Sequence, residues 1–235
     1  MTGRPDLGRR ACAEGIAAFA LVFAGCGAVV TDNRSHGSLG VVGIALTFGL
    51  VIMVMVYATG HLSGAHINPA VTLAFTLTRH FPARDALAYV AAQLAGATAA
   101  ALILLAAWPS APANLGATVP HVGVGSALAY EVVLTAILMF VIVAVATDTR
   151  AVGAAAAIAI GGAVGLDALF GGPITGASMN PARSFGPAFE LMHWQWHWAY
   201  WAAPIAGACA ASLVYEHLLL ERMRPKVDEP RAMRA

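Results

Sequence analysis

Two heptapeptides decide the fold of this chain: Gly64-Ala65-His66-Ile67-Asn68-Pro69-Ala70 and Gly176-Ala177-Ser178-Met179-Asn180-Pro181-Ala182. Both follow the pattern Gly-Ala-X-X-Asn-Pro-Ala, and they lie 112 residues apart, close to half of the 235-residue chain. Asparagine is a good N-cap, and proline fits the first helical turn because its missing N–H costs nothing there. Each motif therefore predicts the start of a helix, and their repetition predicts two equivalent loops that meet at one site.

The composition is that of a membrane protein. Hydrophobic residues make up 59% of the chain, charged residues make up 11%, and the mean hydropathy is +0.74. Soluble domains have roughly 45–50% apolar and about 25% charged residues. Lipid is therefore the expected partner of most of the surface, and a net charge of +1 gives no indication of a nucleic-acid partner.

Apolar stretches long enough to cross a bilayer, which takes about 20 residues, occur six times. We expect these spans at 11–30, 40–59, 84–107, 126–147, 153–171 and 198–220. Two shorter stretches, 68–78 and 180–190, begin at the Asn-Pro-Ala motifs and are half as long. The predicted fold class is an all-α membrane protein with six transmembrane helices and two re-entrant half-helices.

Positive charges predict the orientation, because cytoplasmic loops are enriched in Lys and Arg. With six spans, one side of the membrane receives Arg4, Arg9, Arg10, Arg79, Arg84, Arg150, Arg222, Arg224, Lys226, Arg231 and Arg234. The other side receives only Arg34 and Arg183. We therefore expect a multi-pass protein of the cell (inner or plasma) membrane with both termini in the cytoplasm.

The halves of the chain repeat each other. Each half has three spans, an odd number, so the second half must be inverted in the membrane. The half-helices then enter from opposite sides and meet at their N-termini. The predicted organisation is a single pore domain with a first repeat, a linker, a second inverted repeat and a cytoplasmic tail, at 1–107, 108–125, 126–220 and 221–235.

The chemistry of such a junction suits a narrow water pathway. Irregular backbone at membrane depth persists only when it is buried or lines a cavity. We therefore expect pore-lining carbonyls at Gly64, Ala65, His66, Ile67, Gly176, Ser178 and Met179. The amides of Asn68 and Asn180 would donate hydrogen bonds, and the paired helix dipoles would repel cations. The sequence predicts no catalytic residue, no cofactor and no metal site.

Residues 63–72 and 172–187, which contain these motifs, resemble the aquaporin (major intrinsic protein) family. The resemblance is to a bacterial-type water channel. The resemblance covers nearly all of residues 10–220. It implies that Glu14 and Glu131 brace the two loops, and that the protein is a homotetramer with one pore in each subunit. It also implies a selectivity filter formed by Phe48, Ala168, Ala177 and Arg183.

The filter and other positions of the resemblance disagree about the permeant. Strict water channels of the family usually have histidine where this chain has Ala168, and a smaller residue widens the constriction. In contrast, Ser184, Ala188 and the pair Tyr200-Trp201 are typical of the family's water channels.

The leading hypothesis is a passive channel that conducts water in single file and excludes protons and ions. Glycerol or other small neutral solutes, including metalloid acids, are the alternative, and a secondary active transporter is a more remote one. Asp167, beside the filter position, has no assigned role and is expected only to mark the outer end of its span.

Overall fold

The computed structural model describes residues 5–147 and 155–220, and all regular structure in these two ranges is helical. Six of its helices are long and apolar enough to cross a membrane. They are α1 (Leu7–Arg34), α2 (Gly40–Ser63), α4 (Ala83–Ala107), α5 (Val124–Thr147), α6 (Ala156–Thr175) and α8 (Ala199–Val214), the last continuing into a π-helical turn at Tyr215–Leu220. The six predicted spans are confirmed. The helices α1, α2 and α6 extend up to four residues beyond the predicted spans, and α4 and α5 begin one and two residues earlier than predicted.

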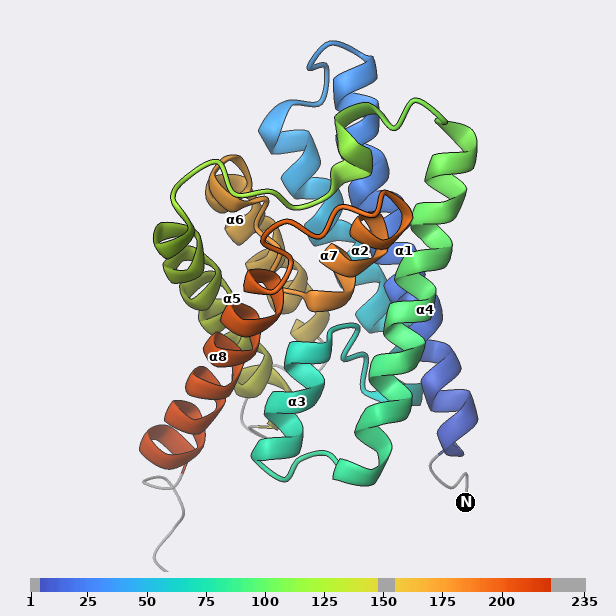
Figure 1. The fold of residues 1–235 in the computed structure, drawn as a ribbon. Helices are drawn as coiled ribbons and strands as arrows, with labels where there is room; N and C mark the ends of the chain where they lie inside the picture. Colours follow the sequence, from blue (N-terminus) through green and yellow to red (C-terminus); the bar gives the residue numbers. More distant parts are fainter. Residues whose placement is uncertain (1–4, 148–154, 221–235) are drawn as a thin grey trace, which may run out of the picture.

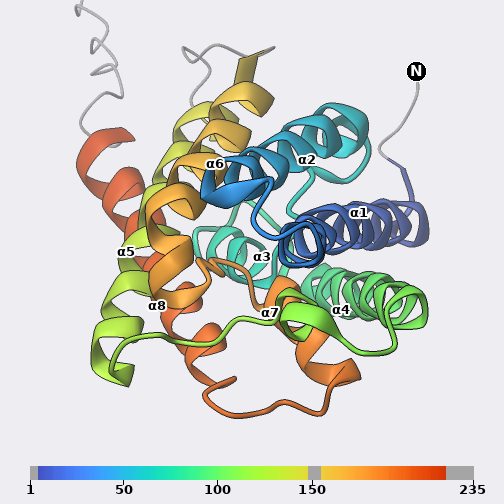
Figure 2. The same cartoon turned by 90° about the horizontal axis from the view of Figure 1, so that it is seen from above.

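Two short helices, α3 (Pro69–Leu77) and α7 (Pro181–Glu190), begin at the Asn-Pro-Ala motifs. Figure 1 shows α3 and α7 in opposite halves of the bundle, and Figure 2 shows the long helices arranged around them. Most of α3 and α7 is buried, although each is too short to cross a membrane. The fold thus places the N-termini of both short helices at mid-depth.

Tight helix crossings hold each half of the bundle together. The principal pairs are α1 with α4, and α5 with α8. A Cβ atom added to Gly96 of α4 would lie 2.0 Å from the carbonyl oxygen of Gly15, and one added to Gly207 of α8 would lie 2.2 Å from that of Val132. Backbones this close need glycine at the crossing, a general feature of helix packing in membranes.

Part of the connection between the halves is buried in the protein and does not only link the two repeats. Its short helical turn η1 (Pro112–Gly116) has left-handed backbone at Ala113, Asn114 and Leu115. Leu115 and Gly116 are buried, and η1 packs on α1. The sequence predicted only a linker here, because a chain without regular hydrophobic periodicity gives no indication of where it packs.

Most basic residues near helix ends in the described ranges lie at one end of the bundle, and the orientation in the membrane stays a prediction. The beginning of α1, the α3–α4 connection and the end of α8 lie at one end of the bundle, and the end of α1 with Arg34 lies at the other (Figure 1). Arg10 is buried, however, and its Nη2 lies 2.8 Å from Oδ2 of Asp85 on α4. Arg4, Arg150 and the residues of the predicted tail lie outside the described residues.

An aromatic cluster supports the C-terminal part of α7. The Phe185 ring lies 5.9 Å from Trp194 and 6.0 Å from His197, and Trp194 lies 5.2 Å from His197. The indole N–H of Trp201 donates to Nε2 of His197 at 3.0 Å, which requires a neutral imidazole with its proton on Nδ1. Burial of this ring lowers the pKa of His197, because desolvation disfavours the charged form.

Acidification is expected to weaken this cluster. An unfolded histidine binds a proton near pH 6.5, whereas folded His197 does so only at lower pH. Stability should therefore fall as the pH drops below about 6.5, by at most about 1.4 kcal/mol per pH unit from this group. We expect His197→Gln to reduce the pH dependence of the thermal unfolding midpoint measured in detergent between pH 7.5 and 5. The control is His36→Gln, because His36 lies in an exposed turn. An equal pH dependence in the wild type and both variants would contradict a role of His197 in this pH dependence.

Candidate functional site

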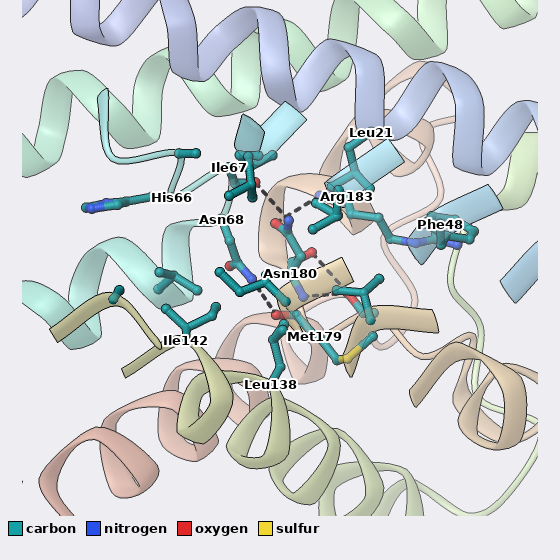
Figure 3. Close-up of a pocket in the computed structure, with 18 of the residues that line it drawn as sticks. Leu21, Phe48, His66, Ile67, Asn68, Leu138, Ile142, Met179, Asn180 and Arg183 are labelled. Carbon is teal, nitrogen blue, oxygen red and sulfur yellow. Dashed lines mark hydrogen bonds between the residues drawn. The ribbon is translucent and has the colours of Figure 1, made fainter. Parts of the chain in front are cut away.

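The two motif asparagines lie side by side and join the two loops (Figure 3). The Nδ2 atom of Asn68 donates to the carbonyl oxygen of Met179 at 2.8 Å, and Nδ2 of Asn180 donates to that of Ile67 at 2.9 Å. Each asparagine also caps its own helix: Oδ1 of Asn68 accepts from the N–H of Ala70 at 2.8 Å, and Oδ1 of Asn180 from that of Ala182 at 3.0 Å. The N-termini of α3 and α7 therefore meet.

These reciprocal bonds leave one N–H donor of each asparagine unused at the junction. A carboxamide NH₂ group has two donors, and each asparagine uses one to bond the opposite loop. The second donor of each remains for another acceptor. Since the positive ends of two helix dipoles converge at the same point, the junction favours an acceptor oxygen and disfavours a cation.

Left-handed backbone shapes both loops in the same way. In the first loop Ala65 and Ile67 have φ values of 48° and 56°, and in the second Ala177 and Met179 have 40° and 53°. Non-glycine residues in this region each cost roughly 1–3 kcal/mol and persist only when their surroundings hold them. The loops therefore require strong local support.

Two buried glutamates provide this support, one in each half. Glu14 of α1 accepts from the N–H groups of His66 and Ile67 at 2.9 and 2.6 Å, and from Ser63 and Gln93 side chains at 2.7 and 2.8 Å. It is fully buried. A carboxylate that receives several donors is the strongest acceptor available to a buried backbone N–H.

Glu131 of α5 makes the equivalent bonds in the second half. It accepts from the N–H groups of Ser178 and Met179, both at 2.8 Å, and from the Thr175 hydroxyl at 2.7 Å. Because both glutamates bind the residues directly before the asparagines, they orient the loop carbonyls whose oxygens accept from the asparagine amides.

An inner cavity of about 70 Å³ runs along the junction. The loop residues from Gly64 to Asn68 and from Ala177 to Asn180 form part of its lining. Most of the remaining lining is apolar and includes Leu21, Ile52, Val56, Leu138, Ile142 and Val164. His66 lies at one end in Figure 3, where its Nδ1 is 3.1 Å from the Thr72 hydroxyl and its ring packs against Phe75.

A second, outer cavity of about 490 Å³ is lined by all four predicted filter residues and by Gly176. Phe48, Ala177 and Arg183 line both cavities, so the junction of the two cavities lies at these side chains. The structure therefore brings Phe48 from α2, Ala168 from α6 and the two residues of the second loop and α7 to one place.

Arg183 makes one contact within the predicted filter and one that the sequence did not predict. Its Nη1 donates to the carbonyl oxygen of Gly116 in η1 at 2.6 Å, and its guanidinium carbon lies 4.9 Å from the centroid of the Phe48 ring. Both contacts restrict the guanidinium to one orientation. No sequence pattern indicated the contact with Gly116, whose φ is +71°.

Asp167 does not mark the end of its helix, contrary to expectation. It lies within α6 and is fully buried, and neither carboxylate oxygen has a hydrogen-bond partner in the described part of the chain. Within residues 5–147 and 155–220, no three His, Cys, Asp or Glu side chains are grouped so that they could hold a metal ion.

Comparison with known proteins identifies the family. The model of the family described as Major intrinsic protein matches residues 2–215. Aquaporin NIP1-3 of Oryza sativa subsp. japonica is 47% identical over 207 residues, which cover 88% of this chain and 72% of the relative. Nodulin-26 of Glycine max is 46% identical over 203 residues, which cover 86% of this chain and 75% of the relative. These relatives are plant proteins, so the bacterial-type qualification stays a prediction.

A solved structure shows the same fold. The X-ray structure of the aquaglyceroporin from Plasmodium falciparum superposes with a TM-score of 0.81 at 23% identity, covering 92% of this chain and 98% of that one. The meeting half-helices, the apolar six-helix bundle and the match along nearly the whole sequence agree with one another. The chain therefore belongs to the major intrinsic protein family, whose members are multi-pass membrane channels and not enzymes.

Proposed function

We propose that this protein is a passive channel through which water moves in single file. The observation that carries the proposal is the reciprocal bonding of Asn68 and Asn180, which leaves one amide donor of each at the inner cavity. A water molecule there accepts from the asparagines and donates to a loop carbonyl. The apolar part of the lining offers no second polar track, which favours a single column of water.

Exclusion of ions follows from the charges at the junction. The converging N-termini of α3 and α7 place partial positive charge at the centre, and Arg183 places a full charge at the constriction. A permeating cation would lose hydration without finding an anionic partner. Water bound to both asparagines through its oxygen would also be oriented against proton transfer along the column.

A second permeant class is favoured by two small side chains. Ala168 and Ala177 present only methyl groups to the outer cavity, which has a volume of about 490 Å³. Arg183 and nearby loop carbonyls supply polar partners beside the Phe48 ring. Small uncharged hydroxylated solutes, such as glycerol or metalloid acids, fit this combination. The secondary transporter hypothesis is not retained, because the family consists of channels.

The proposed setting is the cell (inner or plasma) membrane with both termini in the cytoplasm, following the charge distribution. The proposed assembly is a homotetramer, with a pore in each subunit formed by repeats 1–107 and 126–220. Exposed apolar side chains on α2 and α6, including Leu46, Leu50 and Leu166, supply surface for lipid or a neighbouring subunit.

Stopped-flow light scattering on proteoliposomes tests the proposal directly. Vesicles with the protein should shrink faster in an impermeant osmolyte than empty vesicles, with no pH change that reports proton flow. A panel of glycerol, urea and boric acid then separates the two permeant classes by solute re-entry. Shrinkage no faster than that of empty vesicles, together with absent solute entry, would reject the channel.

Enlarging the fifth-span filter position should narrow the constriction selectively. Ala168→His replaces a methyl group by an imidazole, so we expect glycerol permeability to fall by about tenfold or more and water permeability by less. Ala168→Val should give an intermediate effect, because its side chain is smaller. Equal reduction of water and glycerol fluxes would contradict the placement of Ala168 in the filter.

Loop support can be tested through Glu131. Glu131→Gln replaces one acceptor oxygen by an NH₂ group that faces backbone donors, at a cost of about 1–3 kcal/mol. We expect a lower unfolding midpoint in detergent and reduced water permeability, because the second loop loses its fixed carbonyls. Glu190→Gln, a partly exposed glutamate at the end of α7, is the control. Unchanged stability and permeability in Glu131→Gln would show that the carboxylate does not support the loop.

A further inference from the structure

One face of α1 follows the pore, and its middle position has no side chain. Leu21 lines the inner cavity and Val29 lines the outer cavity. Gly25 lies four residues from each, so it occupies the same helical face at an intermediate depth. That depth corresponds to the constriction, because Phe48 and Arg183 line both cavities.

The aromatic ring of Phe48 fills the space beside Gly25. A Cβ atom added to Gly25 would lie 2.2, 2.5 and 2.6 Å from Cε1, Cδ1 and Cζ of that ring. All three distances are far below van der Waals contact. A Cβ atom at residue 25 and the Phe48 ring in its observed position therefore cannot be present together. The observed position of the ring therefore exists only because residue 25 is glycine.

The same ring position determines the contact with Arg183. With the ring against α1, its centroid lies 4.9 Å from the guanidinium carbon, and Phe48 is only 7% exposed. A ring displaced from α1 would have room toward the outer cavity, where Ala168 and Ala177 present only methyl groups. Displacement would thus both fill the constriction and release one of the two contacts that hold Arg183.

We propose that Gly25 is a positioning residue that sets the aperture of the constriction, although Gly25 itself does not line the pore. It acts through Phe48: the missing side chain lets the ring withdraw from the pathway and lie beside Arg183. This inference rests on the proposed channel function, and it names a selectivity determinant that the four filter positions do not include.

The test compares two glycine-to-alanine substitutions on the same helix. Gly25→Ala must displace the Phe48 ring, whereas a Cβ at Gly27 would lie 3.6 Å from Cδ2 of Leu104, an ordinary contact. Water, urea and glycerol permeabilities are measured on proteoliposomes and normalised to the amount of folded, monodisperse protein. For the largest probe that the wild type conducts (water, if no solute passes), we expect about a tenfold loss in Gly25→Ala and wild-type permeability in Gly27→Ala.

A double substitution separates the aperture from general packing. In a Phe48→Ala background there is no ring to displace, so adding Gly25→Ala should leave every permeability unchanged. A Gly25→Ala protein that conducts all probes like the wild type would overturn the inference. The inference would also be overturned if Gly25→Ala reduced permeability equally with and without the Phe48 ring. It would be overturned as well if the Gly25→Ala protein folded only in the Phe48→Ala background. In both cases the glycine would serve packing alone.

These outcomes differ from failure of the proposed function. A wild-type protein that conducts neither water nor solute rejects the channel itself. A conducting wild type whose Gly25→Ala and Gly27→Ala variants behave alike leaves the channel intact and rejects only the role of Gly25.

Discussion

Backbone N–H groups bound by a buried carboxylate are the interaction on which this structure depends. Glu14 and Glu131 each accept from two consecutive N–H groups of a loop that contains left-handed, non-glycine residues. The four residues that carry these N–H groups are buried, so the donors need acceptors within the protein. Without the carboxylates the loops would have neither their conformation nor their fixed carbonyl oxygens.

The order of the remaining contacts follows from this support. The braced loops direct the carbonyl groups of Ile67 and Met179 toward the opposite half, where Asn180 and Asn68 donate to them. The bonds between asparagines and loops then hold α3 and α7 end to end. Because α7 carries Arg183 in its first turn, the same set of bonds also places the guanidinium between the two cavities.

Local signals made much of this fold predictable. Apolar length predicted the six long helices, and the Asn-Pro pairs predicted the starts of α3 and α7, because helix capping depends on neighbouring residues alone. The contact of Arg183 with Gly116 and the ion pair of Arg10 with Asp85 were not predictable in this way. Each joins residues more than 60 positions apart, and neither has a local pattern that names its partner.

Taken alone, the amino-acid order determined that the chain is a membrane protein with two half-length helices capped by Asn68 and Asn180, since hydropathy and capping are properties of short segments. Tertiary structure alone decided the shape of the two cavities where they meet. The position of the Phe48 ring depends on Gly25 in another helix, and the orientation of Arg183 depends on η1. The positions of these two side chains arise from packing between distant segments. The residue types at the filter positions do not specify that packing.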